Sequence, residues 1–176
     1  MASPNDPGVW LDRLERALGR ARPDMDDEEQ EALAAEAIDA LFGVGLALSA
    51  GTLSLPLVQP LLERAREQVK MLREGFELVV EHDPNPLASE IVFPDVYENR
   101  CVTRSGVQWA IELYGDAIAS PELQAGLERF DHILQQAAEG GASLGPEDIP
   151  AAVPRSHWWW RAPFDGRPAG VTSSRA

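Results

Sequence analysis

The sequence is poor in cysteine and lysine: Cys101 is the only cysteine and Lys70 the only lysine among 176 residues. A single cysteine excludes an internal disulfide and a CxxC metal or redox pair, so we expect a reducing, cytoplasmic location. The net charge is −14. Because nucleic acids and anionic membranes are bound through clustered lysine and arginine, this charge argues against nucleic-acid binding and favours a cationic protein partner.

Several motifs of catalysis and metal binding are also missing. The chain has no HExxH, no Glu-x-x-His and no GK[ST], which are common signatures of zinc sites, di-iron bundles and phosphate loops. His82 follows the expected end of a helix, where capping explains it. Glu128 and His132 form an i,i+4 pair that a surface helix also explains. We therefore predict no metal, no cofactor and no catalytic residue.

The longest uncharged run, residues 40–62, could cross a bilayer as a helix. Gly51, Ser54 and Pro56 interrupt it, a pattern that predicts the end of one helix and the start of another. We favour a helical hairpin in a soluble protein. Membrane association is a less favoured hypothesis, and it predicts partition into the membrane fraction. The first residues, MASPNDPG, lack the basic and apolar regions of a secretory signal.

Apolar residues at spacings of three and four predict about five helices. Their expected ranges are about 7–21, 26–50, 57–81, 103–118 and 121–139. In the second helix, Gly43, Ala47 and Gly51 recur every four residues, a stripe we expect to admit a neighbouring backbone. Between the third and fourth helices we expect an irregular segment that includes the strand-like run 90–93. The fold prediction is a mainly α-helical bundle, with a helical domain at 1–154 and an extended C-terminal arm with a frayed tail at 155–176.

The arm carries the sequence SHWWWRAPF, in which His157 and Arg161 flank Trp158, Trp159 and Trp160. Flanking prolines favour an extended chain, with the first and third tryptophans on one side and the second on the other. Exposed together they would promote aggregation, so something must cover them. We keep three interpretations: a strap on the protein's own core, an anchor for a protein partner, and a stacking surface for a planar ligand.

A second candidate surface is the acidic run Asp26, Asp27, Glu28 and Glu29. Acidic residues complement the N-terminus of a helix, so a solvated helix start explains the run. The same charges would also steer a cationic partner.

Together these features favour a non-enzymatic bacterial interaction protein: an adaptor, an assembly factor or an immunity-type inhibitor. It would bind a protein partner through the acidic run and the arm, and self-association stays open. The alternative is a small helical enzyme or ligand-binding protein with a pocket between residues 90–104 and the arm. Its candidate residues are Tyr97, Arg100 and Cys101, together with His157 and Trp159.

Overall fold

The computed structural model describes residues 6–88 and 93–162. These residues form seven α-helices and three short 3-10 helices, and no strand occurs among them. The mainly helical prediction is therefore confirmed. The elements are α1 (Pro7–Leu18), α2 (Asp27–Ser49), α3 (Leu55–Arg64), α4 (Arg66–Met71), α5 (Arg73–His82), η1 (Asn85–Ala88), α6 (Pro94–Tyr114), η2 (Gly115–Ala117), α7 (Pro121–Glu139) and η3 (Trp158–Arg161).

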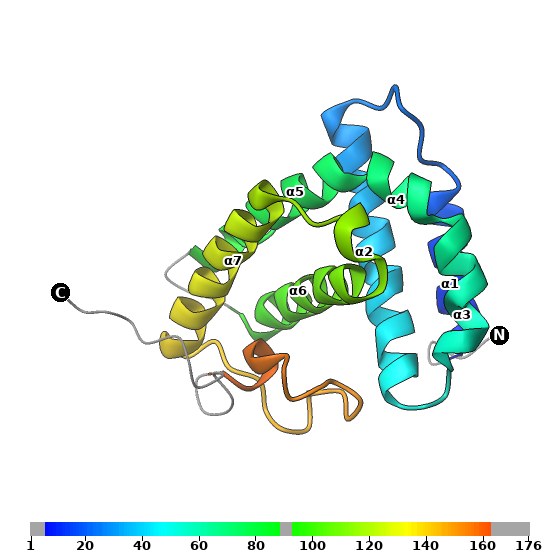
Figure 1. Ribbon diagram of the computed structural model, residues 1–176. Coiled ribbons are helices and arrows are strands. Elements are labelled where there is room, and N and C mark those ends of the chain that lie inside the picture. Colours follow the sequence, from blue (N-terminus) through cyan, green and yellow to red (C-terminus); the bar gives the residue numbers. More distant parts are fainter. Residues whose placement is uncertain (1–5, 89–92, 163–176) are drawn as a thin grey trace.

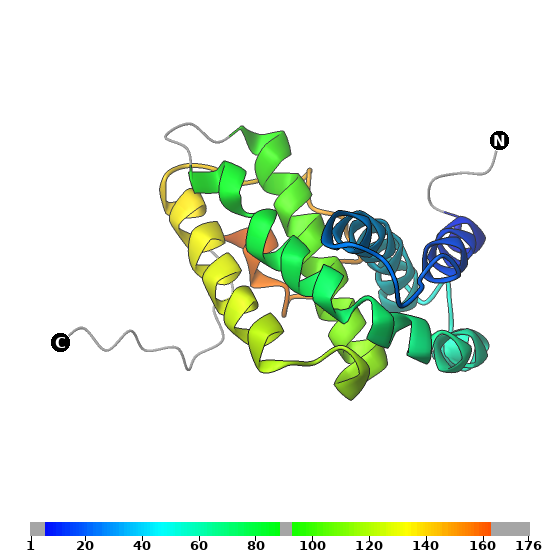
Figure 2. The ribbon, with the colours of Figure 1, turned by 90° about the horizontal axis from the view of Figure 1, so that it is seen from above.

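Helix α2 lies at the centre, with α1 and α3 on one flank and α5, α6 and α7 on the other (Figures 1 and 2). The predicted stripe does not admit a neighbouring backbone at its two glycines, because Gly43 faces the Trp10 side chain and Gly51 lies in the turn after α2, with nothing within 4 Å of an added Cβ. A Cβ at Gly43 or Gly45 would overlap an indole ring, that of Trp10 or Trp109 respectively. Gly106 on α6 faces the carbonyl of Ile38 on α2. The small residue that lets the backbones of these two helices approach therefore lies on α6, not on α2.

The uncharged run is interrupted as predicted. Gly51 has φ +70°, and the backbone N–H groups of Thr52 and Leu53 both donate to the carbonyl of Ala47. Such left-handed turns commonly end a helix. By length and composition α2 itself could span a membrane, but core helices of soluble proteins pass the same test, and most of its apolar stretch is buried.

The single helix predicted for residues 57–81 is three helices, α3, α4 and α5, separated at Ala65 and Leu72. The two breaks turn the chain around one end of α2 (Figure 1). At each break an arginine reaches a distant carbonyl: Arg66 donates to that of Tyr114 and Arg73 to that of Ala117. Each of the three helices keeps buried apolar residues, because the chain changes direction at the breaks and follows the core.

The fourth predicted helix starts too late. Helix α6 begins at Pro94, about two and a half helical turns before the predicted start at residue 103. Proline suits the first position of a helix, and Phe93 before it is extended. Residues 94–102 are thus helical and not irregular, while residues 90–92, most of the strand-like run, lie outside the described residues.

Candidate functional site

The four acidic residues of the run 26–29 have separate roles in the structure. Asp26 caps α2, since its carboxylate accepts the backbone N–H of Glu29 at 2.8 Å. The Glu29 side chain pairs with Arg22 at 2.7 Å. Asp27 and Glu28 line two different surface pockets, one on each side of α5. The run is therefore both a helix start and part of a larger acidic face.

The acidic groove is a pocket of about 540 Å³ beside α5 and α7. It contains five carboxylates and one guanidinium, and none of the ion pairs between described residues involves any of those carboxylates. Glu77 accepts the Ser120 hydroxyl at 2.6 Å. The lining residues are Asp27, Glu74, Glu77, Leu78, Glu81, Glu122, Ala125 and Arg129.

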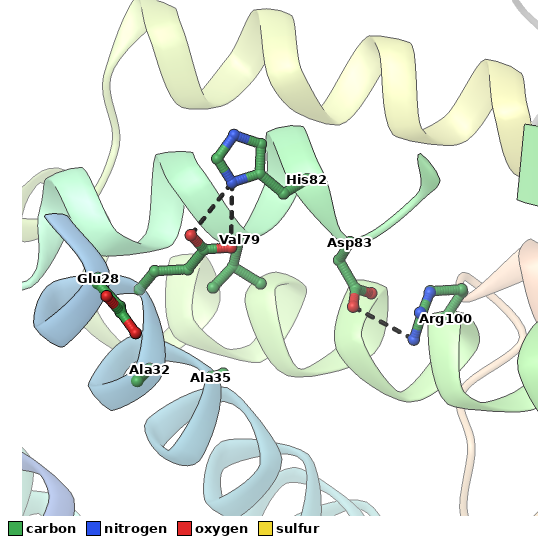
Figure 3. Close-up of a pocket in the computed structure, with 8 residues that line it drawn as sticks. Glu28, Ala32, Ala35, Val79, His82, Asp83 and Arg100 are labelled. Carbon is green, nitrogen blue, oxygen red and sulfur yellow. Dashed lines mark hydrogen bonds and ion pairs between the residues drawn. The ribbon is translucent and has the colours of Figure 1, made fainter. Parts of the chain in front are cut away.

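On the other side of α5 lies a pocket of about 440 Å³, with Ala32, Ala35 and Val79 among its lining residues (Figure 3). Its charges are mixed. The Nδ1 atom of His82 lies 3.1 Å from both carboxylate oxygens of Glu31.

In the same pocket Arg100 pairs with Asp83 at 3.2 Å (Figure 3). Burial raises the pKa of the Asp83 carboxyl, and Arg100 opposes that rise. Within the described residues, no group of three or more histidine, cysteine or carboxylate side chains is arranged to hold a metal ion. The mixed charges set this pocket apart from the acidic groove.

The arm is not extended where the tryptophans lie. Residues Trp158–Arg161 form the 3-10 helix η3, which turns Trp159 and Trp160 inward together. Trp160 stacks on Phe42 of α2, with ring centroids 5.8 Å apart. The predicted alternation of the three rings is wrong because it assumed a strand-like backbone. The described structure matches the strap interpretation, and a partner could reach these two rings only if the strap came away.

One hydroxyl holds the strap to α6. Ser105 Oγ accepts the indole N–H groups of Trp159 at 2.9 Å and Trp160 at 2.8 Å, and it lies 3.1 Å from Nδ1 of His157. Ser105 and His157 are both buried. The guanidinium of Arg104 covers the ring of Trp159.

The residues proposed for an alternative pocket are divided between two places. Tyr97 donates its hydroxyl to the carbonyl of Trp159 at 2.8 Å, and the Cys101 thiol lies 3.6 Å from the same oxygen. Burial raises the pKa values of both groups. Arg100 instead lines the pocket beside Asp83. Residues 94–104 do meet the arm, but through packed side chains.

The sequence analysis missed Arg104 and Ser105, and one signal could have found them. With a helix starting at Pro94, positions 97, 101 and 104–105 fall on one face at helical spacing. Arg104 also forms a forked ion pair with Asp131 of α7 at 2.7 and 3.1 Å. Because the predicted helix starts at residue 103, positions 97 and 101 lay outside it, and the shared face was not recognised.

A further motif, GxSxG, occurs at residues 141–145 as GASLG, and the sequence analysis overlooked it. A hydrolase nucleophile elbow requires a strand before the serine and a helix after it. Here the motif follows helix α7 and precedes a turn. No hydrogen bond between described residues joins the Ser143 hydroxyl to a histidine. The structural context of an elbow is missing around it.

Comparisons with known proteins leave the function to be argued from this structure. No protein-family model matches the chain, and neither the curated proteins nor the solved structures gave a match.

Proposed function

We propose that this chain is a non-enzymatic interaction protein that binds a basic protein partner through the acidic groove. The observation that carries the proposal is the groove's lining, in which five carboxylates face one arginine. Like charges held together on a surface repel one another, and a cationic partner relieves that repulsion. An adaptor, an assembly factor or an immunity-type inhibitor of a bacterial cytoplasm fits this mode of binding.

The groove can also provide more than charge. Leu78 and Ala125 lie among its carboxylates, so a lysine or arginine side chain can place its aliphatic stem on apolar atoms and its charge against the rim. The arm has a different role in this proposal. Because Trp159 and Trp160 are buried in the chain itself, the arm supports the fold and the groove supplies the contact surface.

The alternative ligand-binding function has less support. Its expected pocket lay between residues 90–104 and the arm, where Tyr97, Cys101 and Trp159 are buried against one another. The acidic groove remains the better candidate for a contact surface.

Affinity capture from the native host lysate tests the proposal. The groove variant carries Glu74→Gln, Glu81→Gln and Glu122→Gln. The matched control carries Glu112→Gln, Glu139→Gln and Glu147→Gln, which change the net charge equally at exposed positions outside the groove. We expect the wild type and the control to retain a stoichiometric basic partner at low salt, and the groove variant to lose it.

High salt should release that partner, because exposed charges are screened. Retention of the partner by the groove variant would contradict the proposal. Equal loss from both variants would also contradict it, since binding would then follow net charge and not the groove.

A further inference from the structure

The contact at Ser105 fixes the proton positions in the strap. An indole nitrogen can only donate, so the two tryptophan N–H groups occupy both lone pairs of the Ser105 oxygen. The one hydroxyl proton is left to donate to Nδ1 of His157. His157 is therefore neutral, with its proton on Nε2, and Nε2 has no hydrogen-bond partner among the described residues.

A protonated His157 does not fit this arrangement. Its Nδ1 would become a third N–H donor pointing at an oxygen whose lone pairs are both used. It would also place a positive charge in a buried site near other cations. Burial, together with the positive charges of Arg104 and Arg161, lowers the pKa of His157 to about 4.

The surrounding groups offer no compensating anion at the ring. On α6 they are Arg104, Cys101 and Tyr97, of which the last two stay protonated because burial raises their pKa values. On α7, Asp131 is already engaged by Arg104. On the strap itself, Arg161 is occupied by the carbonyls of residues 153 and 154. Helix α2 contributes Phe42, from a run without charge.

We propose that residues 153–162 are an acid-released strap, in which protonation of His157 breaks the three-way contact at Ser105 and frees Trp159 and Trp160 from the bundle. Release would expose the aromatic side chains that the docked strap hides. Trp159 and Trp160 can then serve as an anchor for a protein partner only when the strap is released. This device operates whether or not the acidic groove binds a partner.

The direction of the pH effect follows from the lowered pKa. A docked histidine with a pKa below its ordinary value of 6.5 favours docking fully above that value. Docking weakens as the pH falls from about 6.5 towards 4, tenfold for each unit. At pH 5 the docking equilibrium is therefore about 20-fold weaker than at pH 7.

Hydrogen exchange on the intact chain tests the strap. The readouts are the indole N–H groups of Trp159 and Trp160, compared with the backbone N–H of Leu41 in α2. In the wild type we expect protection factors of the two indoles to fall about 20-fold between pH 7 and pH 5, with that of Leu41 unchanged. His157→Asn keeps an acceptor near the Nδ1 position without a proton to gain, so its indole protection should not change with pH. His132→Asn, an exposed histidine, is the matched control and should behave as the wild type.

If His157→Asn docks poorly at every pH, a direct titration of the wild-type imidazole by NMR replaces it. An imidazole that titrates near 6.5 would overturn the proposal. So would an equal fall in protection at Leu41, because the histidine would then report unfolding of the whole chain. Equal pH dependence in the wild type and His157→Asn would overturn it as well.

Discussion

The guanidinium of Arg104 lies over the indole ring of Trp159, with 4.2 Å between the guanidinium carbon and the ring centroid. The same guanidinium is held by both oxygens of Asp131. One buried side chain thus joins the strap to α6 and α7.

The next two residues of α6 serve different neighbours. Ser105 binds the two indoles, and Gly106 faces the backbone of α2 at Ile38. Three consecutive residues therefore join the strap, α7 and α2 to one turn of helix. Each of them can be tested separately.

Arg104→Gln should lower the free energy of unfolding by about 2–3 kcal/mol. This is less than the loss from a fully buried ion pair, because Asp131 keeps 29% of its side-chain surface exposed. Arg13→Gln is the matched control, since Arg13 also pairs with an aspartate and covers a tryptophan, but at the surface. Its loss should stay below about 1 kcal/mol. Urea unfolding measures both, and equal losses would contradict the importance of burial here.

Ser105→Ala should lower the free energy of unfolding by about 2–4 kcal/mol. Two buried indole N–H groups lose their acceptor, and each such loss costs about 1–3 kcal/mol. Ser156→Ala, at an exposed position of the same arm, should change stability little. Urea unfolding followed by tryptophan fluorescence gives both values. A neutral Ser105→Ala would show that the hydroxyl does not hold the strap.

Gly106→Ala should destabilise the fold by about 1–3 kcal/mol, although alanine is the better helix former. The added Cβ would overlap the carbonyl oxygen of Ile38 and push α6 away from α2. Gly140→Ala is the control, because its added Cβ would lie 3.3 Å from the carbonyl oxygen of Ala137, a close contact that a shift of a few tenths of an ångström relieves. Thermal unfolding compares the two. A stabilised Gly106→Ala protein would mean that the two helices are not in this close contact.

Glu81→Gln should raise the free energy of unfolding at low salt. It removes a charge from the acidic groove and from the last turn of α5, where a negative charge is unfavourable. Glu112→Gln removes a charge near the end of α6, outside the groove. We expect Glu81→Gln to gain about 0.3 kcal/mol more than this control, with the difference vanishing at high salt. An equal gain would mean that the groove carboxylates do not repel one another.

The sequence predicts those parts of the fold that are marked by local chemistry. Ser120 and Pro121 mark the start of α7, and Gly51 marks the turn after α2. Ala65 and Leu72 carry no such mark, because both are good helix formers and only the packing around α2 bends the chain there. For the same reason the division of the predicted third helix could not be read from spacing.

The candidate sites show a similar division. Acidic residues at the start of α2 are visible in the sequence, but the groove also needs α5 and α7, which only the folded chain brings beside them. We placed Pro94 in the irregular segment, although proline equally suits the first position of a helix. With the start of α6 placed too late, the face of α6 that carries Tyr97 and Ser105, on which the strap docks, was not predicted.

The strap also affects how the chain folds during synthesis. Its indoles bind Ser105 across 54 and 55 residues of sequence, whereas α1 and α2 are neighbours along the chain. Because the chain is made from its N-terminus, the helical hairpin of α1 and α2 is available early, whereas the face of α6 that binds the strap must wait for residues 157–160. Until those residues leave the ribosome, the aromatic ring of Phe42 and the face around Tyr97 lack their cover. A nascent chain paused between α7 and the strap is therefore prone to aggregate through these uncovered aromatic groups.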